Sequence, residues 1–111
     1  IADGYYEWQR VENKKIPYYI FRKDKKNVYL AGIFQENEFC IITQKASTIL
    51  KKVHERQPVI LNEQDINKYL NLELNGFEVL NNIIYPELDF YKVSTEVNKP
   101  NNNDNTLIKP A

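Results

Sequence analysis

Alternating polar and apolar residues dominate the first half of the chain and predict β-strands. Residues 4–10 send Glu7 to one face and Trp8 to the other, because successive side chains of a strand point in opposite directions. The aromatic side chains in this run also favour a strand. Three further strand-like runs follow, at residues 16–21, 28–35 and 39–43. Four successive strands joined by short polar links predict an antiparallel meander.

Helical spacing replaces this alternation in the second half of the chain. Apolar residues spaced three and four apart over residues 46–53 predict a short amphipathic helix. Asn62 is a good N-cap for a second helix, and a third helical stretch follows Gly76. Residues 89–94 alternate again as a last strand. Residues 98–105 are polar and without periodicity, so we expect a loop there.

Strands first and helices later are typical of an α+β fold, here an antiparallel β meander followed by short helices and a last strand. The chain has 111 residues, which is enough for one domain with one core. No internal repeat or domain boundary is visible, so residues 1–111 are expected to form a single domain. No apolar stretch approaches the length of a membrane span.

The charges are balanced in number but uneven in position. The chain carries 15 Lys and Arg against 15 Asp and Glu, so its net charge gives no argument for nucleic acid binding. Residues 1–56 carry 11 basic and 7 acidic side chains, and residues 57–111 carry 4 basic and 8 acidic ones. The basic half could face phosphates. Solvated lysines at hairpin tips, such as Lys25 and Lys26, explain the asymmetry equally well.

A single cysteine, Cys40, excludes an internal disulfide. It lies in an apolar run, residues 39–42, where a cysteine is expected to be buried and inert. The one histidine, His54, is far from Cys40 in the sequence, so no metal-ligand cluster is predicted. No cofactor is indicated.

Residues 53–58 hold the candidate chemistry. They contain the only histidine, His54, and one of three arginines, Arg56. Pro58 disfavours helix just before it, so His54 is expected where a helix gives way to a strand. Such a junction holds side chains in a fixed frame. Imidazole exchanges protons near neutral pH, and a guanidinium suits phosphate or carboxylate.

Spacing alone leaves simpler interpretations open. His54 would then be a half-buried histidine at a helix end, and Arg56 a surface arginine beside it. Glu7 is either a solvated residue or a carboxylate aimed into a cleft. Trp8, on the opposite face, is expected to anchor the core.

Four motifs give the chain a family resemblance. They are Ala-Asp-Gly-Tyr-Tyr-Glu-Trp at residues 2–8, Ile-Ile-Thr at 41–43, His-Glu-Arg-Gln-Pro at 54–58, and an asparagine-rich run that leads to Leu-Ile-Lys-Pro at 107–110. In this order they resemble the SRAP family, the SOS response-associated peptidases, also called abasic site processing proteins. The resemblance covers essentially the whole chain.

The resemblance implies an activity and a set of residues. Family members bind single-stranded DNA at abasic sites, where their N-terminal cysteine attacks the ring-opened sugar aldehyde and closes a stable thiazolidine with its amine and thiol. By motif, Glu7 and His54 match the active-site glutamate and histidine, and Thr43 and Arg56 match positions near the DNA backbone. The family's peptidase label is consistent with self-processing. The resemblance also implies a cytoplasmic protein that joins the nucleoid during DNA damage.

The start of the chain departs from the family pattern. Family members begin Met-Cys-Gly-Arg, whereas this chain begins at Ile1 in a strand-like run. We therefore expect the C-terminal portion of a longer SRAP-like domain, which lacks the nucleophilic cysteine and is inactive by itself. Its expected partners are single-stranded DNA with abasic sites and the missing N-terminal portion of the domain. The sequence indicates no oligomeric state.

Two other classes of protein remain open. One is a noncatalytic single-stranded nucleic acid binding module that stacks bases on its tyrosines. Loss of His54 would hardly affect such a module. The other is a structural fragment that folds only beside its missing half, and an exposed apolar edge around residues 1–8 would mark it.

Overall fold

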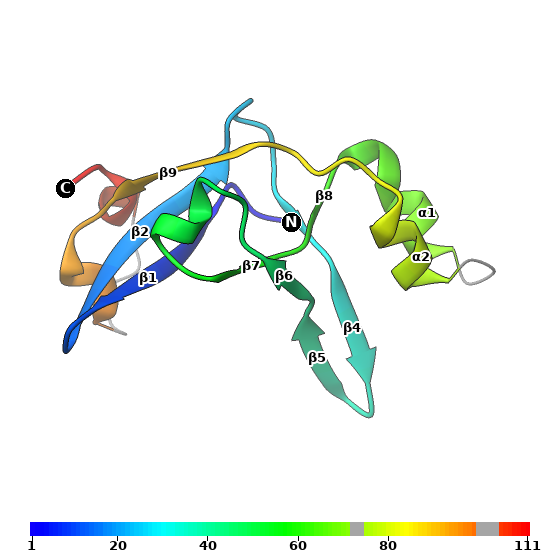
Figure 1. Cartoon of the computed structure of the whole chain (residues 1–111), viewed down its shortest axis with the longest axis horizontal. Coiled ribbons are helices and arrows are strands. Elements are labelled where there is room, and N and C mark those ends of the chain that lie inside the picture. The colour runs from blue at the N-terminus through cyan, green and yellow to red at the C-terminus, as the bar shows by residue number, and fades with distance from the viewer. Residues whose placement is uncertain (72–74, 100–104) are drawn as a thin grey trace.

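A three-stranded antiparallel sheet forms one end of the molecule (Figure 1). The computed structural model describes residues 1–71, 75–99 and 105–111, and the molecule measures 44 × 32 × 27 Å. The order of the sheet is β1-β2-β9, so β1 is an edge strand. Its strands are β1 (Tyr5–Val11), β2 (Lys14–Arg22) and β9 (Leu88–Lys92).

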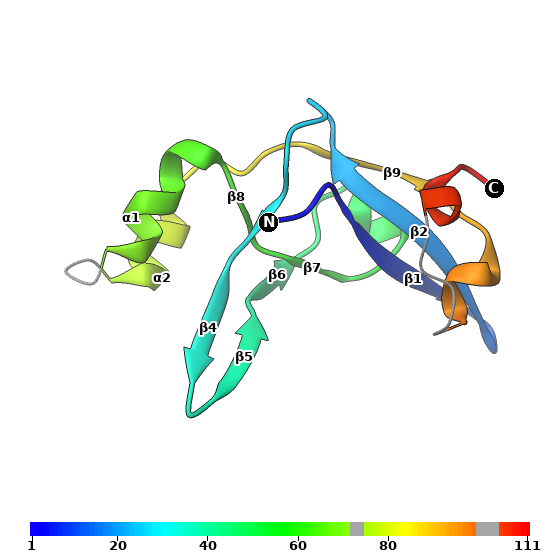
Figure 2. The ribbon, with the colours of Figure 1, turned by 180° about the vertical axis from the view of Figure 1, so that it is seen from behind.

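Three two-stranded pairs connect this sheet to the rest of the fold. The pairs are β3 (Tyr29–Leu30) with β8 (Ile60–Leu61), β4 (Gly32–Gln35) with β5 (Glu38–Ile41), and β6 (Thr43–Lys45) with β7 (Arg56–Pro58). The β4–β5 hairpin projects from the body in both views (Figures 1 and 2). Its two-residue turn, Glu36 and Asn37, has positive φ at both positions, as the twist of a tight hairpin requires.

The helices are short. They are η1 (Leu50–Lys52), η2 (Glu63–Asp65), α1 (Ile66–Leu70), α2 (Gly76–Asn81), η3 (Thr95–Asn98) and η4 (Asn105–Ile108). The helices α1 and α2 lie at the end of the molecule opposite the three-stranded sheet (Figure 2). Among the described residues, no helix is long and apolar enough to cross a membrane.

Two clusters of buried side chains form the core. The first packs the sheet against η1 and β8, through Ile20, Val28, Ala46, Leu50, Ile60 and Leu88. The second lies under the helices α1 and α2 and consists of Ala31, Val59, Leu61 and Leu80. Because Leu50 is only 2% exposed, η1 is anchored on the sheet, and the segment that follows η1 is held beside β1.

The predicted α+β class is confirmed, and the details of pairing and helix length differ. The strand β2 pairs with β1 on one side and with β9 on the other. The strands therefore form separate pairs and not one continuous meander. The predicted helix over 46–53 is reduced to the single 3₁₀ turn of η1. The start of the 46–53 segment is tied to β7, because the N–H of Ser47 donates to Oε1 of Gln57 at 2.8 Å.

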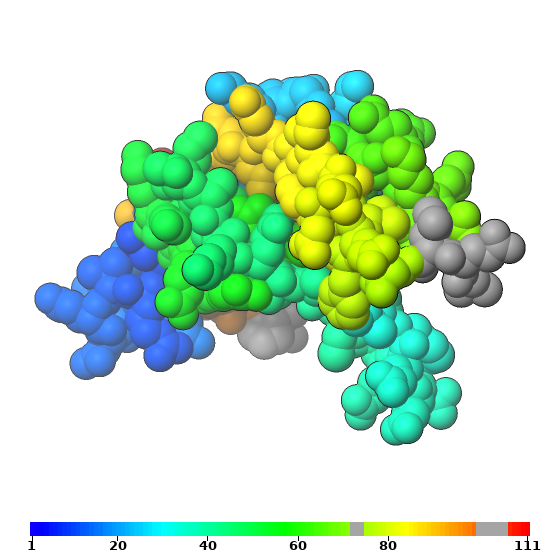
Figure 3. All heavy atoms as spheres, turned by 45° about the vertical axis from the view of Figure 1, so that its right-hand side comes forward, coloured from blue at the N-terminus to red at the C-terminus, as the bar shows by residue number. Residues whose placement is uncertain are grey.

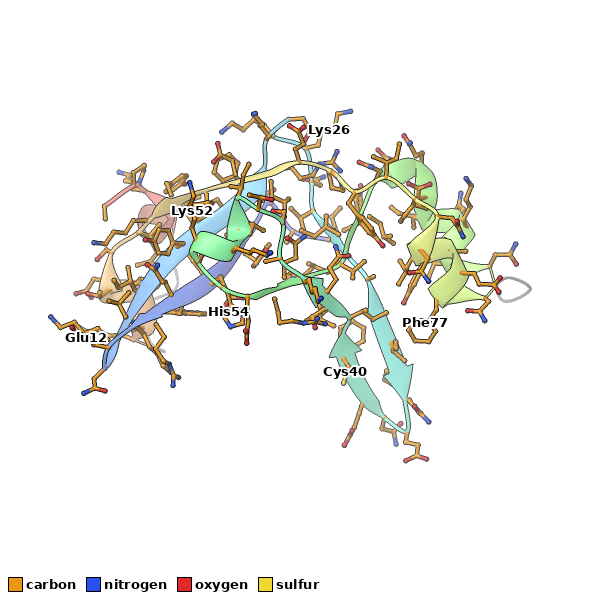
Figure 4. All side chains as sticks on the ribbon, in the orientation of Figure 1. Glu12, Lys26, Cys40, Lys52, His54 and Phe77 are labelled. Carbon is orange, nitrogen blue, oxygen red and sulfur yellow. The ribbon has the colours of Figure 1, made fainter. Side chains whose placement is uncertain are left out.

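The expectation that Cys40 is buried is wrong. Its thiol is free and exposed on the β4–β5 hairpin (Figure 4). The apolar run around Cys40 resembles a core strand in sequence. However, among the described residues its strand pairs with one neighbour only, and the apolar side chains of the hairpin stay exposed.

Gly4 provides space at the start of β1. A Cβ atom built there would lie 2.5 Å from the carbonyl oxygen of Ile20 and 2.5 Å from Cζ of Tyr19. The φ angle of Gly4 is not positive, so glycine is needed here because it has no side chain and not because the backbone is unusual. The ring of Tyr19 therefore crosses the chain just before Tyr5 pairs with Ile20.

Candidate active-site groove

Glu7 and His54 line the same groove. It has a volume of about 1020 Å³ and runs between β1 and the segment that follows η1. Val97 and Asn98 of η3 close one side of it. Figure 4 shows His54 and Lys52 on the side of the molecule that carries η1. The structure thus brings together the carboxylate and the imidazole that the sequence motifs indicate.

The position of Glu7 follows from its place on the edge strand. It pairs with Tyr18 of β2, so its side chain points to the sheet face opposite Trp8. Oε1 of Glu7 accepts a hydrogen bond from the N–H of Trp8 at 3.1 Å. Trp8 in turn lies opposite Pro17, which has no N–H to offer. The carboxylate is therefore held at the strand that borders the groove.

His54 is held by the end of η1. Its N–H donates to the carbonyl oxygen of Leu50 at 3.0 Å, and Leu50 is buried. One residue pair also ties η1 to β1, because Nε2 of Gln9 donates to the carbonyl oxygen of Lys52 at 2.7 Å. The imidazole itself is exposed. A buried anchor thus presents an accessible ring, as expected for a helix-to-strand junction.

The ring of His54 contacts the backbone two residues later. The N–H of Arg56 donates to Nδ1 of His54 at 3.1 Å, and the carbonyl oxygen of Arg56 lies 3.1 Å from the same nitrogen. Nδ1 is therefore occupied by local backbone, and Nε2 is the nitrogen left for a substrate.

Thr43 and Arg56 form a second pair, beside the groove and not among its lining residues. Nη2 of Arg56 donates to the carbonyl oxygen of Thr43 at 3.0 Å and to its Oγ1 at 3.1 Å. Both residues sit on the β6–β7 pair, whose register places Thr43 opposite Pro58. Arg56 is exposed, and its Nε and Nη1 make no hydrogen bond to the described residues.

The groove is rich in cations. Four basic side chains line it, against two carboxylates, those of Glu7 and Glu55. Within the described ranges, none of the four forms an ion pair. The basic residues are Arg10, Lys15, Lys51 and Lys52. This arrangement attracts anions to a groove that also holds the imidazole of His54.

Sequence reasoning missed the part of the groove that Trp8 and Asn98 form. Trp8 was expected to anchor the core, but it is only half-buried, and its Nε1 donates to Oδ1 of Asn98 at 2.5 Å. Its ring instead belongs to a row of aromatic side chains on one face of the sheet. In this row the ring centroids of Trp8 and Tyr6 are 6.4 Å apart. The predicted polar loop 98–105 reaches the groove at Asn98, and residues 100–104 lie outside the described residues.

The fold and the groove define an α+β domain whose site combines a carboxylate, an imidazole and several cations. The sequence profile of one family, described as SOS response associated peptidase (SRAP), matches residues 1–100. The chain belongs to the SRAP family.

Several proteins named as abasic site processing proteins are similar to the chain. YoqW of Bacillus subtilis is 31% identical over 122 residues, which cover 97% of this chain and 54% of YoqW. YedK of Escherichia coli is 28% identical over 123 residues, which cover 99% of this chain and 55% of YedK. HMCES of Rattus norvegicus is 30% identical, covering 100% of this chain and 42% of HMCES.

A solved structure shares the fold. The crystal structure of a protein from Bacteroides thetaiotaomicron superposes with a TM-score of 0.78 at 28% identity, over 98% of this chain and 54% of the other. The chain therefore spans about half the length of the relatives it matches.

Proposed function

We propose that the chain supplies part of the active site of an abasic site processing protein, which links itself covalently to abasic sites in single-stranded DNA. The observation that carries the proposal is that Glu7 and His54 line one cation-rich groove in a chain of the SRAP family. The names of its relatives YoqW, YedK and HMCES support the substrate.

The proposed reaction needs proton transfer at two stages. An abasic sugar must open to its aldehyde, and the attack of an amine on that aldehyde must lose water to give an imine. A thiol on the same residue then closes the thiazolidine ring. The nucleophile is an N-terminal cysteine, which is not among residues 1–111. In this scheme His54 and Glu7 move the protons, which is a role that suits an imidazole and a carboxylate.

The proposed DNA contacts come from Arg56 and from two lysines of η1. Arg56 offers its free Nε and Nη1 to a phosphate, while its Nη2 is held by Thr43. Lys51 and Lys52 reach the groove from η1. An abasic site has no base to read, so these backbone contacts would carry recognition, with stacking on neighbouring bases.

The test is a crosslinking assay with an abasic single-stranded oligonucleotide. The chain is joined to a polypeptide that begins Cys-Gly-Arg and supplies the half of YoqW that the chain does not match. We expect a heat-stable band on a denaturing gel. His54→Ala should slow its formation by roughly 10²–10⁴-fold, the usual contribution of a positioned proton-transfer group.

Glu7→Gln tests the second group, and Glu87→Gln is its control, because Glu87 is exposed and is not among the residues that line the groove. Equal crosslinking rates for the wild type, His54→Ala and Glu7→Gln would contradict the proposal. If these variants also bound abasic and intact oligonucleotides alike, the noncatalytic binding module would be the better description.

A further inference from the structure

A second pocket lies beyond the end of β2 and shares no lining residue with the active-site groove. The link between β2 and β3 forms one side of it, and the start of η2 forms the other. Figure 3 shows this link along the upper rim of the molecule. The pocket has a volume of about 630 Å³, within the range of roughly 300–1,000 Å³ that is typical of small-ligand sites.

Arg22 is a buried cation in the wall of this pocket. It is only 5% exposed, and its guanidinium donates to both carboxylate oxygens of Asp24, from Nε at 2.9 Å and from Nη2 at 2.6 Å. Nη2 also donates to Oδ1 of Asn62 at 3.0 Å, and Nδ2 of Asn62 donates to the carbonyl oxygen of Ile84 at 2.8 Å. Because its partners are themselves held, the guanidinium is in position before any ligand binds.

Lys25 and Lys26 give the pocket its excess of positive charge. Asp24 balances the charge of Arg22, and of the described residues that line the pocket only Glu63 is acidic. Both lysines are exposed, and neither forms an ion pair within the described ranges. Two free ammonium groups beside a fixed guanidinium favour a ligand that carries a phosphate.

The backbone of the link holds both lysines in a defined turn. The N–H of Lys25 donates to the carbonyl oxygen of Arg22 at 2.9 Å, and the N–H of Lys26 donates to Oδ1 of Asp24 at 3.0 Å. Lys25 has a φ of 64°, which is uncommon for a residue with a side chain. Its Nζ lies 4.0 Å from the centroid of the Phe21 ring, a cation–π contact that steadies the side chain.

The rest of the pocket suits an aromatic base. Tyr29 is half-buried and packs against the second core cluster, so its ring is held in place. Asn27 and Gln64 contribute exposed amide groups, each of which offers both a donor and an acceptor. Bases stack on aromatic rings, and amides pair with base edges. Phosphate alone would use only the cations, whereas a nucleotide uses both kinds of group.

We propose that this pocket binds a nucleoside phosphate, with the phosphate on Lys25 and Lys26 and the base against Tyr29. The nucleotide is either free or one unit of a strand, because both sources present the same phosphate and base. This inference goes beyond the proposed function and does not rest on it, since the pocket and the groove have no lining residue in common.

The experiment titrates the ¹⁵N-labelled chain with thymidine monophosphate and follows the amide signals by NMR. Saturable shifts should appear at residues 25–29 and 62–64. Inorganic phosphate should bind the same residues about tenfold more weakly, because it lacks the base that stacks. Thymidine without phosphate should bind more weakly as well. A short thymidine oligonucleotide distinguishes the sources. Shifts at the same residues at lower concentration would assign the pocket to a strand, and shifts confined to the groove would assign it to free nucleotides.

Lys25→Gln combined with Lys26→Gln should weaken binding of thymidine monophosphate by about tenfold or more, because hydrogen bonds to a charged group are lost. Glu63→Gln should strengthen binding, since its carboxylate repels the phosphate. Lys14→Gln combined with Lys109→Gln is the matched control, because both lysines are exposed and outside the pocket. All these sites are exposed, so circular dichroism should show the fold retained in each variant.

Three results would overturn the inference. One is the absence of saturable shifts around the pocket with both thymidine monophosphate and the oligonucleotide, which would leave Lys25 and Lys26 as solvated side chains. Another is equal affinity for inorganic phosphate and thymidine monophosphate. The third is equal weakening by the two pairs of lysine substitutions. A chain that binds nucleotide here but fails to crosslink at the groove would contradict the proposed function only.

Discussion

The backbone of Arg56 meets Nδ1 of His54 with both of its polar groups, the N–H at 3.1 Å and the carbonyl oxygen at 3.1 Å. The neutral ring fits these contacts in two ways: a bare Nδ1 accepts from the N–H, and a protonated Nδ1 donates to the carbonyl oxygen. When the ring is charged, Nδ1–H donates to the carbonyl oxygen. When the neutral ring is protonated at Nδ1, Nε2 is bare and can take up a proton while Nδ1–H keeps its partner, so the ring stays in place.

The proposed role of His54 as a base at Nε2 predicts its neutral tautomer. In ¹⁵N-labelled protein at a pH where the ring is neutral, the nitrogen chemical shifts should identify Nδ1 as the protonated nitrogen, which donates to the carbonyl oxygen of Arg56, and Nε2 as the bare one. The histidine is unique in the chain, so the signals need no assignment. Shifts of an averaged pair of tautomers would show that the backbone of Arg56 does not select one.

Arg56→Ala should weaken binding of single-stranded DNA and reduce the slope of log affinity against log salt by about one charge. The reason is that the free donors of Arg56 face no acidic partner in the described ranges. Fluorescence anisotropy over a salt series measures the slope. Lys68→Ala is the control, because Lys68 lies on α1, where it contacts Asp65 at 3.9 Å.

Thr43→Val separates positioning from charge. It removes Oγ1, one of two acceptors for Nη2 of Arg56, and leaves the carbonyl oxygen in place. Affinity should fall while the salt slope stays unchanged. A slope that falls as it does in Arg56→Ala would mean that Thr43 controls whether the guanidinium reaches phosphate at all.

Asp24 should make stability depend on pH. Hydrogen bonds from Arg22 and from the N–H of Lys26 lower the pKa of Asp24 below its ordinary value. A carboxyl whose folded pKa is depressed stabilises the fold above its unfolded pKa, about 3.9, and this contribution is lost as pH falls through the folded pKa.

Urea unfolding at a series of acidic pH values checks this dependence. The unfolding free energy should fall more steeply below pH 4 (approximately the unfolded pKa) in the wild type than in Asp24→Asn. Glu87→Gln is the control, since its carboxylate only approaches Lys23 at 3.8 Å. Parallel curves for the wild type and Asp24→Asn would rule out the linkage.

Tyr5→Phe should leave the chain as stable or make it more stable by about 1 kcal/mol. The hydroxyl of Tyr5 is buried without a hydrogen-bond partner among the described residues. Burial, with the nearby Glu7 carboxylate adding to it, raises the pKa of Tyr5. Removing an unsatisfied buried polar group removes its desolvation cost.

Tyr18→Phe is the matched control for Tyr5→Phe. The hydroxyl of Tyr18 donates to Oε1 of Gln9 at 3.1 Å, so its loss should cost about 1 kcal/mol. Chemical denaturation of both variants gives the comparison. If Tyr5→Phe destabilised the chain as much as Tyr18→Phe does, the Tyr5 hydroxyl would have a partner after all.

The chain with Ile1 as its first residue should form no heat-stable link to abasic DNA. A thiazolidine needs an amine and a thiol on one residue. Ile1 has no thiol, and the amine of Cys40 is part of a peptide bond. Cys40 is exposed, so a labile thiohemiacetal is the most it can form. A heat-resistant shifted band from the chain alone would refute this expectation.

Local pattern was sufficient to predict the elements that carry Glu7 and His54. Period-two alternation separated Glu7 from Trp8, and Pro58 indicated the end of the helical run at His54; the structure has both features. The α+β class also followed from the order of strand-like and helix-like runs. These features depend on neighbours in the sequence, which is why they could be predicted from it.

The features that sequence could not predict depend on distant contacts. Cys40 looked buried because its neighbours are apolar, yet burial requires a second layer, and the sequence does not say where a layer lies. The pairing of β2 with β9 joins strands more than sixty residues apart. Trp8 finds its partner, Asn98, ninety residues along the chain.

Gly4 changes how the opening motif of the chain is to be understood. A side chain at this position would collide with the backbone of Ile20 and the ring of Tyr19, so the glycine is required by crowding. The motif therefore mixes two kinds of requirement, the carboxylate of Glu7 that we propose takes part in proton transfer and an empty space three residues earlier. A relative that carries the glycine without the glutamate would keep the backbone shape at the start of β1 and lose the carboxylate. A search for active relatives should therefore score the two positions separately.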